Sequence, residues 1–574
     1  MSKVKAYLGI KQKKDSYKLA LLNVDANELS VDTAEDVFAW ILDQSTKNIK
    51  IVGAGIDASD FKSLASKLWL KHDISPFKAH KNAEELAKFA AAQFEEDGSY
   101  KAKLSSNNKV LTPFLCDLDA YKKVSDTKQF SQLLKQADSF GNKKILFINA
   151  TPQGGGVALM RHSLMRIYRE LGVSASWHVT IEDPAIFQIT KAKFHNILQD
   201  VAEADTELED SDMKLFDKWS QQNYSLLKPA ISKADVVVID DPQPSGMIPL
   251  IRKDFDKPIV YRSHIHLMAD LAGLVDTPQN KTWKFIWEKI KFVDLFVAHP
   301  KPQFVPNDVP RKKLLYQGAT TDRLDGLNKT LADEQIKYYS GVFNQMLLSE
   351  GQKPLDLHRD FIVQIARFDP SKGIVDVLES YRIFREKHKN TTNAPQLVIA
   401  GNGSVDDPDG APIYQLVRQL LETSEYKEIA DDIKVLRIGH MDQILNMLFQ
   451  TCKVALQLSH KEGFEDKVSG ALYKGKPVII SNTGGIPLQV MEKENGYLVE
   501  PGDTQQTAQY LRKLFEEKNL YQKMSQNAIK LVNPHVNEIA GAVFWLFTAN
   551  RLLEGDFKPN GAYVGDLCFK GASD

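Results

Sequence analysis

Two cations in the second half of the chain have a spacing that suits one phosphate group. Arg367 and Lys372 lie in the segment RFDPSKG, which follows the apolar run FIVQIA and opens a predicted helix. Arg is a planar bidentate donor and Lys a point charge, so the two can converge on one anion. The alternative, a solvated surface pair, is disfavoured because both cations sit where α/β sheets bind ligands.

A glycine-rich loop offers a second anion site. Gly154, Gly155 and Gly156 lie in NATPQGGGVA, directly after a predicted strand and before a predicted helix. Glycines let the backbone approach a ligand, and the helix N-terminus presents unpaired N–H groups. The spacing is not the GxGxxG dinucleotide fingerprint, and a tight turn without a ligand is the alternative.

Histidines and carboxylates follow two further strands of the first half. Arg262 ends PIVYR and is followed by His264 and His266, and Asp240 ends ADVVVID and is followed by Asp241. The carboxylates can orient sugar hydroxyls by accepting hydrogen bonds, or can serve the geometry of an Asp–Pro turn. Two histidines at alternate positions have no third ligand nearby, so we predict no metal site.

The loop GNGSVDDPDG, residues 401–410, is a third candidate and follows the apolar run PQLVIAG. Its composition is typical of a turn. We also expect Gly403 and Asp406 to contact the donor side of a binding site.

Short apolar runs separated by helices must position all these loops. Continuous apolar runs without polar alternation indicate buried parallel strands. Two successive sets therefore predict an α/β fold with two facing Rossmann-like domains and a cleft at the carboxyl ends of their strands. The runs are KKILFINA, ADVVVID, PIVYR and DLFVAH in the first set, and DFIVQIA, PQLVIAG, DIKVLRIG, KVALQLS and KPVIIS in the second.

We predict four segments from this pattern. The first is a small α/β extension without a catalytic constellation, which favours a docking or oligomerisation layer. A helix over Ile539–Leu553 is long and apolar enough to cross back to the first domain. The predicted limits are 1–135 for the extension, 136–345 and 346–540 for the two Rossmann-like domains (acceptor side and donor or phosphate side), and 541–574 for the crossover helix and tail.

Composition narrows the setting. The chain has 574 residues, too many for one core, and 73 Lys plus Arg against 74 Asp plus Glu give no electrostatic case for nucleic acid. Its three cysteines are far apart, which argues against a disulfide framework. We see no signal peptide and no apolar run long enough to span a bilayer, so we expect no membrane association and a reducing, cytoplasmic location.

Together these motifs resemble the retaining family 4 glycosyltransferases of GT-B fold, in the trehalose phosphorylase and trehalose synthase branch, closest to the fungal phosphorylase-like members. The matching segments cover nearly the whole chain. They include NATPQGGGVA, IDDPQP, YRSHIHL, HPKPQFVPNDVP, TDRLDGLNK, ARFDPSKGI, GNGSVDDPDG, KEGFEDKVSGALYKGKPVIISNTGGIPLQV and, in the extension, KLWLKHDISP.

The resemblance implies transfer of an α-glucosyl group with retention, without a metal or other cofactor. It assigns Glu462 to the donor sugar, Arg367 and Lys372 to the leaving phosphate, and His264 to the neighbourhood of the anomeric carbon, as catalytic residues. The substrates implied are trehalose, glucose, and phosphate or glucose 1-phosphate, with UDP- or ADP-glucose as an alternative donor; we also expect a homodimer. The expected substrate-binding residues are Gly154, Gly155, Gly156, Asp240, Asp241, Arg262, Gly403, Asp406, Gly463, Phe464, Gly470, Gly484 and Gly485.

Gly470 is a departure from the family pattern, which has there a second Glu that holds the ribose of a nucleotide donor. A glycine makes no such contact, whereas glucose 1-phosphate has no ribose to hold. We therefore predict phosphorolysis, in which trehalose and phosphate give α-glucose 1-phosphate and glucose reversibly. The alternatives are a trehalose synthase that uses a nucleotide-glucose donor and a catalytically silent sugar-phosphate-binding regulator.

Overall fold

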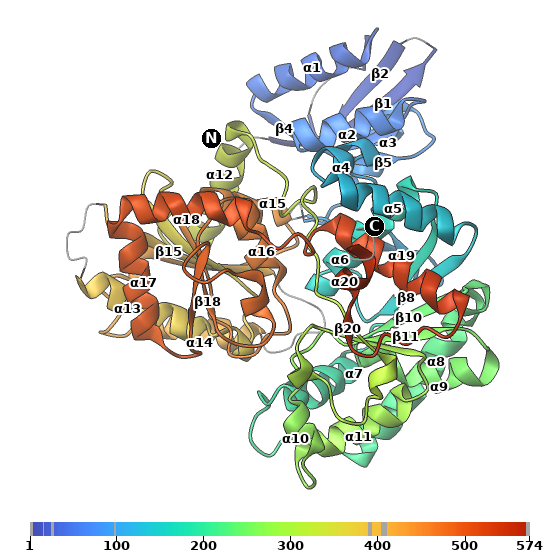
Figure 1. Cartoon of the computed structure of the whole chain (residues 1–574). Coiled ribbons are helices and arrows are strands. Elements are labelled where there is room, and N and C mark those ends of the chain that lie inside the picture. Colours follow the sequence, from blue (N-terminus) through green and yellow to red (C-terminus); the bar gives the residue numbers. More distant parts are fainter. Residues whose placement is uncertain are drawn as a thin grey trace.

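Three larger sheets organise the chain into three α/β units (Figure 1). The computed structural model describes residues 4–14, 16–24, 28–96, 99–387, 393–402 and 410–569. Two of the sheets are parallel throughout and have helices on both faces, so the predicted α/β fold with two Rossmann-like domains is confirmed. The domain limits themselves stay a prediction.

The first parallel sheet has seven strands in the order β20-β13-β12-β11-β10-β8-β9. Separate apolar cores cover its two faces, which explains the continuous apolar runs of its central strands. Four strands match the predicted runs, while β9, β13 and β20 were not predicted because they are edge strands or very short. The bounds are β8 Lys144–Asn149, β9 Ser174–Val179, β10 Val236–Asp240, β11 Ile259–Arg262, β12 Leu295–Ala298, β13 Leu314–Tyr316 and β20 Ala562–Tyr563.

The C-terminal part of the chain returns to this first sheet. Helix α19 (Glu538–Glu554) packs on α5 (Thr127–Phe140) and α6 (Gly156–Glu170), and Trp545 of α19 meets the ring of Phe147 edge-on at 5.4 Å. Strand β20 then adds the outer edge of the sheet. Helix α5 runs across residue 135, where the sequence predicts the end of the extension, and belongs by its packing to the first parallel sheet. The other helices on this sheet include α8 Asp210–Lys233, α9 Ile248–Asp254 and α11 Pro278–Ile290.

The second parallel sheet has six strands in the order β16-β15-β14-β17-β18-β19. Its five predicted strands are all present, and β19 extends the edge beyond β18. Both faces are again covered by apolar cores. The strands are β14 Phe361–Ile365, β15 Gln396–Asn402, β16 Ile433–Ile438, β17 Val454–Gln457, β18 Val478–Ser481 and β19 Gly496–Val499; the helices are α12 Asp333–Ser349, α13 Ile374–Lys387, α14 Gly410–Leu421, α15 Asp442–Thr451, α16 Asp466–Tyr473, α17 Thr504–Glu516 and α18 Lys518–Lys530.

The N-terminal unit has a mixed sheet of five strands in the order β3-β2-β1-β4-β5, with antiparallel and parallel pairs. Helix α3 lies so close to this sheet that a Cβ on Gly9 would come within 1.7 Å of the Ala83 carbonyl oxygen. Its elements are β1 Val4–Lys13, β2 Ser16–Leu22, β3 Leu29–Val31, β4 Ile49–Asp57, β5 Ser75–Lys78, α1 Ala34–Thr46, α2 Phe61–His72 and α3 Ala83–Ala91. The following helix α4 (Leu118–Lys123) packs, like α5, into the core of the first parallel sheet.

Buried polar contacts fasten the N-terminal unit to the segment that joins the two parallel sheets. Lys329 of that segment pairs with Asp73 at 2.7 Å, and the Tyr339 hydroxyl of α12 donates to the same carboxylate. The Trp69 indole donates to the Leu324 carbonyl at 2.7 Å. The unit therefore contacts both the connecting segment and the second Rossmann-like domain.

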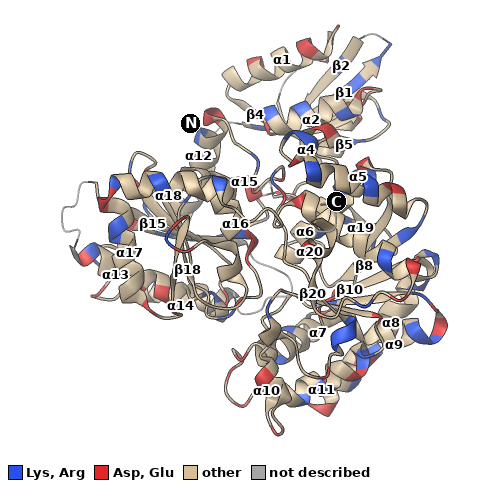
Figure 2. Cartoon of the chain, viewed as in Figure 1, with Lys and Arg blue, Asp and Glu red and all other residues tan. Residues whose placement is uncertain are grey.

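Charged residues of both signs are interspersed over all three units (Figure 2), as the balanced composition leads one to expect. Within the described residues, none of the helices combines the length and the apolar character needed to cross a bilayer.

Candidate functional site

A cavity of about 340 Å³ lies between the carboxyl ends of the two parallel sheets. Such a crevice is where open α/β sheets bind ligands. Both Rossmann-like domains and the N-terminal unit line it. Of the predicted site residues, it brings together Gly154, Gly155, Gly156, Asp240, Asp241, His264, Arg367, Lys372, Glu462, Gly463 and Phe464.

The glycine-rich loop reaches the cavity at the start of α6. Gly154 has a φ of 97°, in the left-handed region where glycine is favoured. Gly155 is the N-cap, and a Cβ on it would have no described atom within 4 Å, so open space faces this backbone. The free N–H groups of the first turn of α6 can bind an anion there.

Lys372 lies between two acidic residues of the opposite loop. Its ammonium donates to the carboxylates of Glu462 and Glu465, at 3.2 Å in the second case. Burial opposes the charge of Lys372, but these two carboxylates outweigh burial and raise its pKa. Burial also raises the pKa of Glu462, which Lys372 opposes. The predicted phosphate cation and the predicted sugar-binding carboxylate are thus direct partners.

Arg367 lies beside Asp369 in the loop that also contains Lys372. The Arg367 guanidinium is 3.7 Å from the Asp369 carboxylate, which also accepts hydrogen bonds from Ser371. A third cation, Lys191, reaches Asp369 from the first domain at 2.6 Å. Burial opposes ionisation of Asp369, but Lys191 and Arg367 hold its pKa far below the ordinary value.

Asp240 is a buried carboxylate that orients other residues. Arg161 binds both of its oxygens, at 2.8 and 2.6 Å, and the His264 ring contacts it at 2.9 Å through Nε2. Burial disfavours the charge, yet Arg161 and His264 lower the pKa of Asp240 to about 2. Burial and the Arg262 charge lower the pKa of His264 to about 4, so its ring is neutral at pH 7.

Asp241 holds the backbone of the same loop. Its carboxylate accepts the His264 backbone N–H at 2.7 Å, and its φ of 64° is a left-handed conformation that Asp and Asn tolerate better than most residues. Burial raises the pKa of Asp241 to about 7, and the neighbouring Asp240 adds to the increase. Both interpretations from the sequence, site carboxylates and turn geometry, therefore describe part of this dipeptide.

The backbone carbonyl of His264 lies where the two domains meet. His299 Nε2 contacts this oxygen at 3.1 Å, and the Arg262 guanidinium contacts His299 Nδ1 at 3.2 Å. A Cβ on Gly463 would be 2.2 Å from the same oxygen, so only glycine allows this approach. Arg262 thus contacts His299 but does not line the main cavity. The Phe464 ring stacks on His299 at 5.7 Å and lines the cavity.

Three predicted glycines lie behind the cavity wall. A Cβ on Gly484 would be 1.7 Å from the Glu462 carbonyl oxygen, and one on Gly485 would be 2.1 Å from that of Gly463. Only glycine at these two positions therefore allows the segment after β18 to pack directly against the backbone of the Glu462 loop. Gly470 lies inside α16, and a Cβ there would be 2.6 Å from Asn328 Oδ1. None of the three lines the cavity, and Gly403 and Asp406 lie outside the described residues.

Several lining residues were not predicted. Glu465, Asp466 and Lys467 form a buried acid–base cluster at the start of α16, and their closeness to Glu462 in the sequence was the available signal. Burial and Glu465 raise the pKa of Asp466 to about 6. The N-terminal unit adds an aromatic part of the wall, which no motif marks: Trp69, Phe77 and Tyr100.

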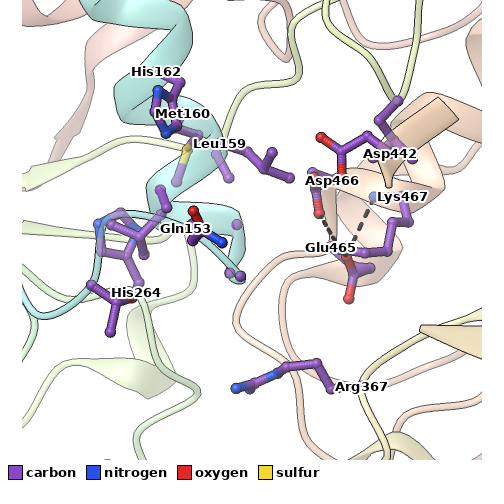
Figure 3. Close-up of a pocket in the computed structure, with 18 of the residues that line it drawn as sticks. Gln153, Leu159, Met160, His162, His264, Arg367, Asp442, Glu465, Asp466 and Lys467 are labelled. Atoms are coloured by element: carbon purple, nitrogen blue, oxygen red, sulfur yellow. Dashed lines mark hydrogen bonds and ion pairs between the residues drawn. The ribbon is translucent and has the colours of Figure 1, made fainter. Parts of the chain in front are cut away.

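The two sides of the cavity differ in chemistry (Figure 3). Gln153, Met160, His162 and His264 face the acidic side chains Asp442, Glu465 and Asp466 across the space, with Arg367 at one end. The arrangement provides cations for an anion at that end and hydrogen-bond acceptors for hydroxyl groups along the rest. Among the described residues no cluster of three or more His, Cys, Asp or Glu side chains has the geometry of a metal site.

Two family models match the domains that form this cleft. Residues 349–531 match the model described as glycosyl transferases group 1, and residues 147–306 match the model described as the N-terminal domain of trehalose synthase. Solved structures of low identity share the fold. An α,α-trehalose-phosphate synthase (UDP-forming) from Burkholderia xenovorans, at 14% identity, superposes with a TM-score of 0.55 over 72% of this chain and all of that one.

Comparison with curated relatives identifies a narrower family for the chain. It is 30% identical to the trehalose synthase of Thermococcus litoralis over 72% of this chain and 91% of the relative. It is 44% identical to the trehalose phosphorylase of Pleurotus pulmonarius over 79% of this chain, and 43% identical to that of Grifola frondosa. The chain spans 63% of the length of these two fungal relatives. It belongs to the glycosyltransferase family of the trehalose synthases and trehalose phosphorylases.

Proposed function

We propose that the chain is a retaining trehalose phosphorylase, which converts trehalose and phosphate reversibly into α-glucose 1-phosphate and glucose. One observation carries this proposal: the cations Arg367 and Lys372 meet the glycine-rich turn and Glu462 in one cavity, while Gly470 offers no group to a ribose. The similarity to fungal proteins named trehalose phosphorylase supports it.

In the proposed reaction the bond between the anomeric carbon and the bridging oxygen breaks, and a phosphate oxygen bonds the same face of that carbon. The proton of the phosphate passes to the departing glucose oxygen, so atoms and charge balance. Arg367, Lys372 and the first turn of α6 stabilise the phosphate. Glu462 accepts hydrogen bonds from hydroxyls of the transferred glucosyl group, and the His264 carbonyl faces the positive charge that develops at its anomeric carbon.

Gly470 argues against a nucleotide donor, because a glycine offers no carboxylate to the hydroxyls of a ribose. Beyond the phosphate cations the wall carries Asp442, Glu465 and Asp466, which can accept hydrogen bonds from the hydroxyls of the sugars. The archaeal relatives named trehalose synthase make a nucleotide-dependent synthase the second candidate function.

Product analysis tests the proposal. Purified protein is incubated with trehalose and phosphate, and in parallel with glucose and UDP- or ADP-glucose. We expect α-glucose 1-phosphate in the first reaction and no trehalose in the second. Trehalose formed only from a nucleotide sugar would replace the proposal by the synthase; tight binding of phosphate or trehalose without turnover would replace it by the silent regulator. The cytoplasmic location and the homodimer stay predictions from the sequence, and light scattering tests the second.

A further inference from the structure

Lys191 belongs to an unusual helical segment of the first domain. Residues Ile189–Asn196 form a π-helix, a conformation that is rare and frequent at functional sites. The segment carries Lys191 to the cavity wall, where its side chain is buried and pairs with Asp369 of the second domain at 2.6 Å. None of the motifs identified from the sequence includes this lysine.

Asp369 and Lys372, which lie in the same loop, have different charged neighbours. Asp369 has two cationic neighbours, Lys191 at 2.6 Å and Arg367 at 3.7 Å. Lys372 instead has two acidic neighbours, Glu462 and Glu465. Asp369 thus draws two cations, one from each Rossmann-like domain, to the same end of the cavity.

We propose that Lys191 is a direct ligand of phosphate, which it shares with Arg367 across the cleft; this inference rests on the proposed phosphorylase function. An ammonium has three N–H donors, and the contact with Asp369 uses one of them. Since Lys191 and Arg367 come from different domains, a phosphate held by both connects the domains and favours the closed cleft.

Inorganic phosphate and α-glucose 1-phosphate serve as probes in calorimetric titrations of the full chain. Lys191→Ala is expected to weaken the binding of both about ten- to hundredfold, the range of a charge-assisted hydrogen bond. Lys191→Arg is expected to restore most of the affinity. Lys193→Ala is the matched control, because Lys193 lies in the same π-helix but pairs with Asp212 of the same domain at 2.7 Å; it should bind phosphate like the wild type.

A second variant separates a phosphate ligand from a structural brace. Asp369→Asn breaks the same ion pair by removing the carboxylate, so the charge of Lys191 is then available to the anion. A phosphate ligand therefore predicts opposite effects, with weaker binding in Lys191→Ala and equal or tighter binding in Asp369→Asn. A brace predicts that both variants weaken binding and lower the melting temperature together.

The outcomes distinguish this inference from the proposed function. If the wild type binds neither phosphate nor glucose 1-phosphate, the proposed function fails and the role of Lys191 fails with it. If the wild type binds them and Lys191→Ala binds within twofold of it, the role of Lys191 is overturned while phosphorolysis stands. In the kinetic assay, a rise in KM for phosphate larger than the rise for trehalose supports the ligand role, and equal rises contradict it.

Discussion

Lys372 and Glu462 form an ion pair inside the cleft, although 90 residues separate them in the chain. Both side chains are largely buried, and Glu465 is the second partner of the lysine. The family resemblance assigns Lys372 to phosphate and Glu462 to sugar. The pair means that each fixes the position of the other, so substrate contacts on both sides of the transferred group depend on it.

This pair predicts a strong dependence of stability on the charge of Lys372. Lys372→Met leaves Glu462 and Glu465 buried without their shared cation and should lower the free energy of unfolding by about 3–5 kcal/mol. Glu462→Gln should cost less, because Glu465 still compensates Lys372. Urea unfolding of both single variants and the double variant measures the coupling. Strictly additive effects would show that the pair contributes nothing.

The fold was predictable to the extent that burial leaves a pattern in the sequence. Strands covered on both faces are continuous apolar runs, and these gave the central strands of both parallel sheets. Strand β9 (SASWHV) alternates polar and apolar residues at a sheet edge, and β20 has only two residues. Neither forms a continuous apolar run, which is why these edges could not be predicted.

The candidate site was predictable where a loop follows a strand and contains its own chemistry. Arg367, Lys372 and Glu462 are in such loops, and all three line the cavity. Lys191 lies in a π-helix without a motif, and Trp69 comes from the N-terminal unit. Their places depend on how separate units pack, which local sequence does not encode.

Asp241 predicts a pH dependence of stability. Its folded pKa of about 7 exceeds its ordinary value of 3.8, so the folded state binds the proton more tightly than the unfolded state. The contribution of Asp241 to stability is therefore present at low pH and is lost as the pH rises from about 4 to about 7. Asp241→Asn keeps an acceptor for the His264 N–H and should remove this loss. Denaturant unfolding from pH 4 to 8 should show the variant gaining on the wild type as the pH rises; parallel profiles would contradict the assignment.

Asp73 predicts that the N-terminal unit stabilises the rest of the chain. Its carboxylate compensates the buried Lys329 at 2.7 Å, and Lys50 at 3.2 Å. Asp73→Asn leaves Lys329 uncompensated and should lower the free energy of unfolding by about 3–5 kcal/mol. Asp57→Asn is the control in the same unit, because its partners Lys11 and His80 are more exposed and the cost should stay below about 1 kcal/mol.

Acid should reduce the difference between Asp73→Asn and the wild type. Burial opposes ionisation of Asp73, but Lys329 and Lys50 outweigh it and lower its pKa below 3.8. A lowered pKa gives stability that is present above the ordinary value and is lost as the pH falls through the folded pKa. A difference that stays constant down to pH 2 would argue against the ion pair as its cause.

Arg367 predicts a loss of phosphorolysis without a loss of folding. Its side chain is partly exposed at the end of the cavity, so Arg367→Ala should fold. Removing a preorganised cation from a phosphate site should lower kcat/KM about 100-fold or more. Arg382→Ala is the control, because Arg382 pairs with Glu379 and Glu386 on α13, away from the cavity. Full activity of Arg367→Ala would remove the assignment of the phosphate site.

Gly470 predicts a reversal of the usual effect of alanine in a helix. Glycine inside a helix is ordinarily about 0.5–1 kcal/mol less favourable than alanine. At Gly341 in α12 a Cβ would meet no described atom within 4 Å, so Gly341→Ala should stabilise by about that amount. At Gly470 a Cβ would be 2.6 Å from Asn328 Oδ1, so Gly470→Ala should destabilise by about 1–3 kcal/mol.

The variant Asn328→Ser has a shorter side chain and tests whether the contact with Asn328 causes this destabilisation. Gly470→Ala should lower the free energy of unfolding less in the Asn328→Ser background than in the wild type. The Asn328→Ser background also removes the Asn328 Oδ1 atom that the Cβ of Gly470→Glu would otherwise meet at 2.6 Å. Turnover of trehalose and phosphate by the wild type would show that the reaction does not require Gly470→Glu. If turnover appears only in the double variant of Gly470→Glu with Asn328→Ser, Gly470 disables the enzyme, and the silent regulator replaces the phosphorylase.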